Sequence, residues 1–223
     1  TALVGVAVLS TFMREPSMPD AAQRRERQRI PEGLLRTPLF WSLVVGLFAG
    51  TFTGLAIVGR LEKIGQTLGS PERFYKAAVL VLAIGNASGR AGWGVLIEVF
   101  GTKRAVISCL LLQTVFVTVL IFAGHLGPAL IILSFLVGFN YGGTFVLYVT
   151  EVARTYGPDR VAGVYGLVYL VYVVSGFLAP GAAGMSYVRF GSYVPSLSAA
   201  AAVSFLGAAG FALLYRKAAP AAL

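Results

Sequence analysis

Arg90 is the one charged residue in a long stretch of sequence that otherwise suits lipid. It lies within GNASGRAGWG (85–94), about seven residues, or roughly 10 Å of helix, from the charged loop that begins at Glu98. Placing a guanidinium in hydrocarbon costs about 2.5 kcal/mol or more, so this side chain must face protein or water. Its planar fork of donors matches a carboxylate. Two roles are therefore open: Arg90 anchors an anion in a central cavity, or it bonds helix-end carbonyls or Glu151 and holds the cytoplasmic side closed.

Three polar residues accompany Arg90 in the apolar stretches. Asn86 precedes Arg90 by four residues and therefore shares its helix face. Asn140 and Tyr141 lie in a later apolar stretch, beside a pair of glycines. We expect Asn86, Asn140 and Tyr141 to contribute to the same anion site. For Asn140 and Tyr141, a buried packing role stays open as the alternative.

An aromatic stripe lies near the end of the chain. Tyr165, Tyr169 and Tyr172 are spaced at i, i+4 and i+7, so on a helix they form one face that carries hydroxyl donors. Such a face either packs or sits at the membrane interface, or it lines a cavity and donates to a carboxylate. We take Tyr169 and Tyr172 as candidate substrate contacts.

The composition requires membrane-spanning helices to position these residues. The chain has 223 residues, of which 57% are hydrophobic and 12% charged, against about 25% charged in soluble domains. The apolar residues form uncharged runs of about 20, the length a helix needs to cross the bilayer core. The alternation of apolar and polar residues that a β-barrel requires is absent. The sequence predicts an all-α membrane protein, a bundle of six transmembrane helices, at residues 39–59, 77–97, 105–124, 128–150, 161–184 and 194–215.

Charge distribution predicts the organisation and orientation of the chain. Residues 1–12 resemble the end of a truncated preceding transmembrane helix and lack the basic start of a signal peptide. Residues 13–38, with six arginines and four prolines, predict a cytoplasmic basic linker. The six-helix bundle then occupies 39–217, and a cytoplasmic tail occupies 218–223. With the linker inside, 12 of the 18 Lys and Arg residues lie on the cytoplasmic side, Arg90 lies within a span, and the other five lie outside: Arg60, Lys63, Arg73, Lys76 and Arg189.

This asymmetry also explains the net charge of +9 without nucleic acid as a partner. An enzyme is not expected, because no predicted span has a carboxylate in its interior and the chain holds one Cys and one His. We therefore expect no catalytic residues, no metal site and no cofactor.

A short sequence echo suggests an internal repeat. Residues 48–52 read FAGTF in the first predicted span, and residues 141–145 read YGGTF in the fourth. A separation of three spans is typical of a 3+3 inverted repeat, an arrangement that builds transporters around a site near the bilayer midplane.

The loop GVLIEVFGTKR (94–104) has a spacing with structural meaning. Its glycines permit a tight turn and close helix approach, and its acid can cap a helix or pair with basic neighbours. The loop resembles the signature loop of the major facilitator superfamily, in the copy between the eighth and ninth helices, with Glu98 in the usual Asp place. The resemblance implies a gating or structural role for Gly94, Glu98, Gly101, Lys103, Arg104 and, on the facing span, Glu151.

Three further stretches resemble one branch of that superfamily, the oxalate/formate antiporters and monocarboxylate carriers: LLRTPLFW (34–41), GFNYGGTF (138–145) and YGPDRVAGVYGLVY (156–169). The resemblance covers the whole chain as the C-terminal half of a twelve-helix carrier. It implies that Arg90 engages the substrate carboxylate. Two positions depart from the branch: Asn86 replaces an Asp common in monocarboxylate carriers, and Tyr172 replaces a lysine of the oxalate carriers.

The sequence therefore predicts half of a secondary transporter that moves a small organic anion, a monocarboxylate or an oxalate/formate-type substrate, by alternating access. Its expected partners are that anion, the lipid bilayer, here the bacterial inner membrane, and the missing N-terminal six-helix half. Two alternatives stay open: a major facilitator carrier of another substrate class, such as a sugar or a drug, and a non-transporting membrane sensor or assembly subunit.

Overall fold

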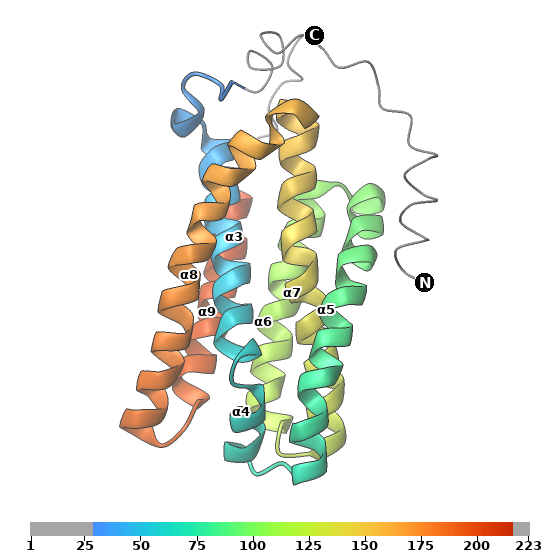
Figure 1. Cartoon of the computed structure of the whole chain (residues 1–223), viewed down its shortest axis with the longest axis vertical. Helices are drawn as coiled ribbons and strands as arrows, with labels where there is room; N and C mark the ends of the chain where they lie inside the picture. Colours follow the sequence, from blue (N-terminus) through green and yellow to red (C-terminus); the bar gives the residue numbers. More distant parts are fainter. Residues whose placement is uncertain (1–28, 216–223) are drawn as a thin grey trace, which may run out of the picture.

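Residues 29–215 are described by a computed structural model in which six long helices run side by side along one axis (Figure 1). All six are long and apolar enough to cross a membrane, which confirms the predicted all-α bundle. The predicted helix end at 1–12, most of the linker and the tail at 218–223 lie outside the described residues. The helices are α3 (Pro38–Val58), α5 (Glu72–Phe100), α6 (Thr102–Ala123), α7 (Gly127–Tyr156), α8 (Val161–Phe190) and α9 (Val194–Leu214).

The helix bounds extend beyond several predicted spans. The span predicted at 161–184 continues as α8 to Phe190, and the span predicted at 77–97 begins five residues earlier, at Glu72. Hydropathy detects only the part of a helix that suits lipid, whereas the backbone stays helical into the headgroup region. A short helix, α4 (Leu61–Thr67), was not predicted; it lies at the opposite end of the bundle from the short helices η1 (Leu34–Arg36) and η2 (Pro158–Arg160) (Figure 1).

Local sequence signals mark the ends of the helices. α3 begins at Pro38, and the hydroxyl of Thr37 accepts a hydrogen bond from the Phe40 amide at 3.3 Å. α5 and α6 are separated by Gly101 alone, whose φ of 74° is favourable only for glycine. The predicted tight turn of the 94–104 loop is therefore present at Gly101.

α5 and α7 run parallel and form the most extensive helix pair in the bundle. Their contact is made by two glycines on each helix, spaced four residues apart. A methyl group on Gly85 or Gly89 would collide with the backbone of α7, and one on Gly138 or Gly142 would collide with the backbone of α5. Close backbone approach through small residues is a common way to pack helices in membranes, where lipid removes the hydrophobic driving force.

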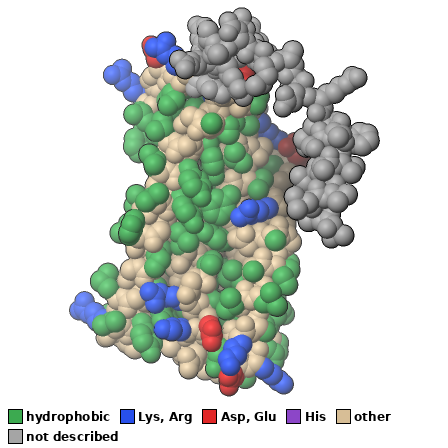
Figure 2. All heavy atoms as spheres, viewed as in Figure 1, with side chains coloured by type: hydrophobic (Ala, Val, Ile, Leu, Met, Phe, Trp, Pro, Cys, Tyr) green, Lys and Arg blue, Asp and Glu red, His purple; other side chains and the backbone are tan. Residues whose placement is uncertain are grey.

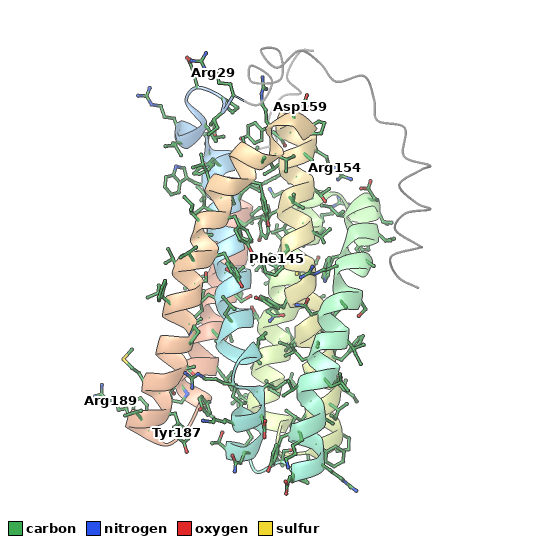
Figure 3. The ribbon with its side chains drawn as sticks, viewed as in Figure 1. Arg29, Phe145, Arg154, Asp159, Tyr187 and Arg189 are labelled. Carbon is green, nitrogen blue, oxygen red and sulfur yellow. The ribbon has the colours of Figure 1, made fainter. Side chains whose placement is uncertain are left out.

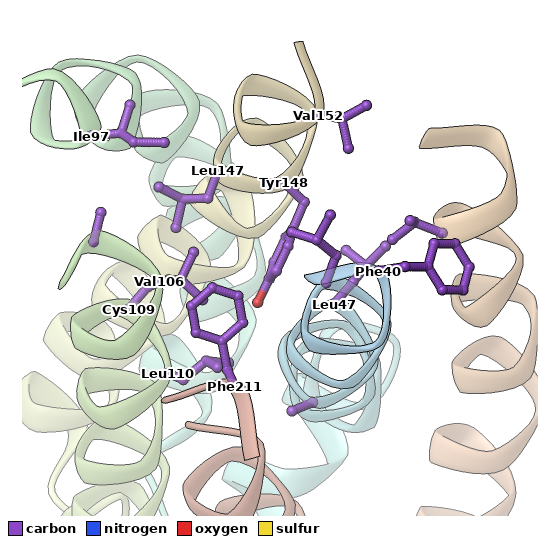
Figure 4. Close-up of a cluster of buried hydrophobic side chains, with 14 of the residues drawn as sticks. Phe40, Leu47, Ile97, Val106, Cys109, Leu110, Leu147, Tyr148, Val152 and Phe211 are labelled. Carbon is purple, nitrogen blue, oxygen red and sulfur yellow. The ribbon is translucent and has the colours of Figure 1, made fainter. Parts of the chain in front are cut away.

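α3 packs on α7 through a second set of glycines. Side chains of α7 fill the surface depressions left by the missing side chains on α3, and the two echo sequences FAGTF and YGGTF meet in this contact. The pairs are Gly46 with Tyr148, Gly50 with Thr144, and Gly54 with Tyr141. Tyr148 also meets Phe211 of α9 in an edge-to-face contact, within the buried cluster shown in Figure 4.

The outer surface of the bundle is apolar along its flank. Figure 2 shows hydrophobic side chains between the two ends, with Lys and Arg mainly towards the ends. On α8, Phe177 is 79% exposed and Val188 is 88% exposed. Apolar surface of this extent is costly in water but suits hydrocarbon or another transmembrane helix, as expected for an integral membrane protein.

Candidate functional site

A cavity of about 560 Å³ opens between α5, α7 and α8. Phe145, one of the residues that line it, lies near the middle of the length of the bundle (Figure 3). Arg29, Arg154 and Asp159 lie towards one end of the bundle, and Tyr187 and Arg189 lie towards the other. This depth corresponds to the interior of the membrane. The lining residues are Asn86, Arg90, Tyr141, Phe145, Val146, Val149, Tyr165, Tyr169 and Tyr172.

Among the residues that the structure describes, Arg90 is the only cation that lines this cavity. Its guanidinium carbon lies 5.9 Å from the centre of the Phe145 ring. Among residues 29–215 it forms no ion pair and no hydrogen bond with a protein acceptor. Its five N–H donors are therefore available to a guest in the cavity.

The alternative role of Arg90, an ion pair with Glu151 that would hold the cytoplasmic side closed, is not seen: the two side chains form no ion pair. The buried Glu151 carboxylate instead accepts hydrogen bonds from the Tyr215 hydroxyl at 2.7 Å and the Thr155 hydroxyl at 3.3 Å. The packing of α5 on α7 explains this, because Asn86 lies beside Gly142. Arg90, four residues further along α5, then lies level with Val146 of α7, roughly 8 Å of helix short of Glu151.

The two asparagines have different environments. Asn86 is partly exposed and lines the cavity. Asn140 does not line it: this residue is 1% exposed, its amide oxygen accepts from the Trp93 indole N–H at 3.1 Å, and its amide nitrogen donates to the Cys109 carbonyl at 3.3 Å. Asn140 thereby joins α5, α6 and α7, which corresponds to the packing alternative.

All three tyrosines of the predicted stripe line the cavity, together with Tyr141 from α7. The rings of Tyr169 and Tyr172 stack with their centres 5.0 Å apart, and those of Tyr165 and Tyr169 lie 5.5 Å apart. The i, i+4, i+7 spacing is what places them on one face of α8. The site thus combines one cation with phenol hydroxyls that can donate to an anion.

Phe145 lies at the centre of this wall and was not among the predicted residues. It contacts Tyr141, Tyr169 and Tyr172 as well as Arg90. A usable signal was present, because Phe145 follows Tyr141 by four residues and therefore shares its helix face. Among the described residues, no group of three or more His, Cys, Asp or Glu side chains is arranged to hold a metal ion.

Comparison with known proteins gives the family. Residues 42–223 match the sequence profile of the Major Facilitator Superfamily. The chain belongs to this superfamily. Its members are transporters rather than enzymes, as the sequence predicted.

Two curated relatives resemble this superfamily chain. It is 29% identical to the uncharacterized MFS-type transporter YhjX of Escherichia coli (strain K12) over 137 residues, 61% of the chain and 34% of that protein. It is 23% identical to the oxalate:formate antiporter of Oxalobacter formigenes over 159 residues, 71% of the chain and 38% of that protein. The predicted resemblance to this branch is thus confirmed as a distant one, and the matches span little more than a third of each relative.

The superfamily loop at 94–104 lies at the same end of the bundle as Arg154 (Figure 3). Glu98 forms an ion pair with Arg154 of α7 rather than with its basic neighbours Lys103 and Arg104, which are both exposed. Gly94 has room for a side chain, since a methyl there would meet Val146 at an ordinary 3.7 Å. In this arrangement the loop ties α5 to α7 at the membrane surface.

Proposed function

We propose that this chain forms half of a secondary carrier for a small organic anion that bears a single carboxylate. The observation that carries the proposal is Arg90, a cation at mid-depth that lines a cavity of about 560 Å³ and has no carboxylate partner among residues 29–215. Arg90 is exposed in this six-helix bundle, but it lies at membrane depth, where a cation is costly unless it meets water or an opposite charge. An anionic substrate supplies the missing charge, and the distant relationship to an oxalate:formate antiporter agrees with that class.

The charge of the cavity favours a monoanion over a dianion. Within residues 29–215, Arg90 is the only cation of its lining, and Tyr172, which also lines it, occupies the position where the oxalate carriers are expected to have a lysine. A dicarboxylate would leave its second charge without a cationic partner in a region of low dielectric constant. A monocarboxylate would be matched by the guanidinium fork, with phenol hydroxyls as further donors.

Transport is proposed to follow alternating access, in which two six-helix halves rock around a site near the midplane. The bundle would supply one wall of that site, and an N-terminal half would supply the other. We place the linker and the C-terminus in the cytoplasm of a bacterial cell, because most Lys and Arg residues then lie inside. On this orientation, the Glu98–Arg154 pair and the hydrogen bonds of Glu151 stabilise the cytoplasmic end.

The test uses the intact carrier that contains this chain, reconstituted in liposomes with labelled lactate, formate or oxalate. Arg90→Gln should lower carboxylate uptake about 30-fold or more, because the charge-assisted hydrogen bonds to the carboxylate are lost. Arg90→Lys keeps the charge but loses the fork, so an intermediate rate is expected. Arg189→Gln, at the far end of the bundle, is the control. The proposal fails if Arg90→Gln transports carboxylates as well as the unaltered carrier.

Two other outcomes would redirect the assignment. Uptake of a sugar or a drug that carboxylates do not inhibit would change the substrate class. Absence of all solute flux, with a protein partner retained, would favour a membrane sensor or assembly subunit.

A further inference from the structure

Arg90 is a cation without a carboxylate, and the side chain it faces is an aromatic ring. Its guanidinium carbon lies 5.9 Å from the centre of the Phe145 ring, at the limit of about 6 Å for a favourable cation–π contact. The ring is itself held by three tyrosines, with centre-to-centre distances of 5.3 Å to Tyr141, 5.8 Å to Tyr172 and 6.2 Å to Tyr169. Phe145 therefore contacts both the guanidinium and three of the four tyrosines that line the cavity; the fourth, Tyr165, is not in contact with it.

We propose that Phe145 is a positioning residue that partly offsets the charge of Arg90 while leaving its N–H donors free for the anion. The inference rests on the proposed function. An aspartate or glutamate in this place would bind the same N–H groups that the substrate needs, so each binding event would first have to displace it. The face of a benzene ring attracts the cation through its quadrupole and accepts no conventional hydrogen bond from the guanidinium fork.

The packing of the helices holds the two partners at this separation. Gly89, next to Arg90 in α5, lies directly against the backbone of α7 at Phe139, and Gly142 of α7 lies against the backbone of α5 at Asn86. These contacts hold the helices that carry Arg90 and Phe145 at close range and in one register. The cation and the ring are thus preorganised before any substrate arrives, which lowers the ordering cost of binding.

The experiment compares Phe145→Leu, Phe145→Trp and Phe145→Tyr in the intact carrier, with labelled formate and lactate as probes. Leucine keeps an apolar side chain but has no π face, whereas tryptophan offers the strongest one. We expect Phe145→Leu to raise KM roughly 3- to 30-fold with kcat within about twofold, and the two aromatic variants to stay near the unaltered KM. Phe135→Leu makes the same change on α7 at a ring that does not line the cavity, and should leave KM unchanged.

A second measurement needs no substrate. The unfolding equilibrium in denaturing detergent is compared for Phe145→Leu, Arg90→Gln and the double variant. We expect Phe145→Leu to lower the folded-to-unfolded ratio about threefold more when Arg90 is present than when it is absent. No coupling in this cycle, or a KM for Phe145→Leu equal to that of Phe145→Trp, overturns the inference.

The measurements distinguish a failure of the proposed function from a failure of the role proposed for Phe145. If the unaltered carrier takes up no carboxylate, the proposed function fails and this inference fails with it. If uptake is normal and Arg90→Gln abolishes it, but Phe145→Leu changes neither KM nor the coupling, only the inference fails.

Discussion

Because α5 and α7 touch through their backbones, Gly89→Ala should lower the thermal stability of the bundle. A Cβ at Gly89 would lie 2.6 Å from the carbonyl carbon and 2.7 Å from the Cα of Phe139, whereas ordinary contacts begin at 3.4 Å. The carbonyl oxygen of Phe139 lies closer still, and because the obstacle is backbone, no side chain can rotate away; the helices must separate locally by clearly more than about 0.8 Å. Overpacking of this kind costs about 1–3 kcal/mol, which for a bundle of this size is a fall in Tm of about 2–12 °C.

The matched control is Gly94→Ala, on the same helix, where a methyl would meet only Val146 at 3.7 Å. Thermal unfolding of both variants in one detergent measures the difference, and Gly94→Ala should keep the Tm of the unaltered protein or raise it by up to about 4 °C. Gly89→Ala should also weaken carboxylate binding, because Arg90 moves with α5 away from the Phe145 ring. Equal Tm values for the two variants would refute the backbone contact and the positioning argument built on it.

Three further predictions concern polar side chains, each measured by thermal or detergent unfolding. Asn140→Ala should destabilise the bundle by about 2–4 kcal/mol, because it removes two buried hydrogen bonds and strands an indole N–H, whereas Asn86→Ala, at the cavity wall, should cost less than about 1 kcal/mol; similar losses would contradict their different placement. A double-mutant cycle of Glu98→Gln and Arg154→Gln should give a coupling below about 1 kcal/mol, since both side chains are partly exposed; a value of several kcal/mol would show that the pair is buried. Tyr215→Phe should cost about 1.5–3 kcal/mol through its lost bond to a buried carboxylate. Burial raises the pKa of the Tyr215 phenol, so the hydroxyl stays protonated and this cost should be the same at about pH 6 and about pH 9; a cost that vanishes at the higher pH would contradict it.

The fold was predictable to the level of six spans because uncharged apolar runs of about 20 residues have few other structures available to them. The helix ends were not, since the continuation of α8 through Tyr187 and Arg189 depends on backbone hydrogen bonds that hydropathy does not measure. α4 escaped prediction because it is short and carries Glu62 and Lys63 between its buried residues Leu61 and Ile64.

The grouping of the cavity residues was predictable where spacing on one helix determined it. Arg90 and Asn86 share a face of α5, and the tyrosines share a face of α8, as the 3.6-residue period requires. Asn140 and Tyr141 are adjacent in sequence, so they point in directions about 100° apart, and only the position of the neighbouring helices decides which one meets the cavity. Both residues were expected at the site, and the structure brings only Tyr141 to it.

Phe145 was overlooked for a related reason. A phenylalanine in a transmembrane helix is ordinary packing material, and its role here depends on a cation contributed by another helix. The helical period places Phe145 on the same face of α7 as Tyr141, but neither the period nor the composition of α7 shows that a cation from α5 meets that face.

The glycines of α8 differ from those of α5 and α7 in one respect that bears on how such carriers diversify. A side chain added at Gly166, Gly176 or Gly181 would meet no atom of this bundle within 4 Å, whereas Gly85, Gly89, Gly138 and Gly142 admit none. Within this bundle, a methyl group is therefore tolerated at these three positions of α8, whereas it is excluded where α5 and α7 touch. When variants with altered substrate preference are selected by laboratory evolution, we expect their substitutions to accumulate along α8. We expect the four glycines in the contact between α5 and α7 to stay unchanged.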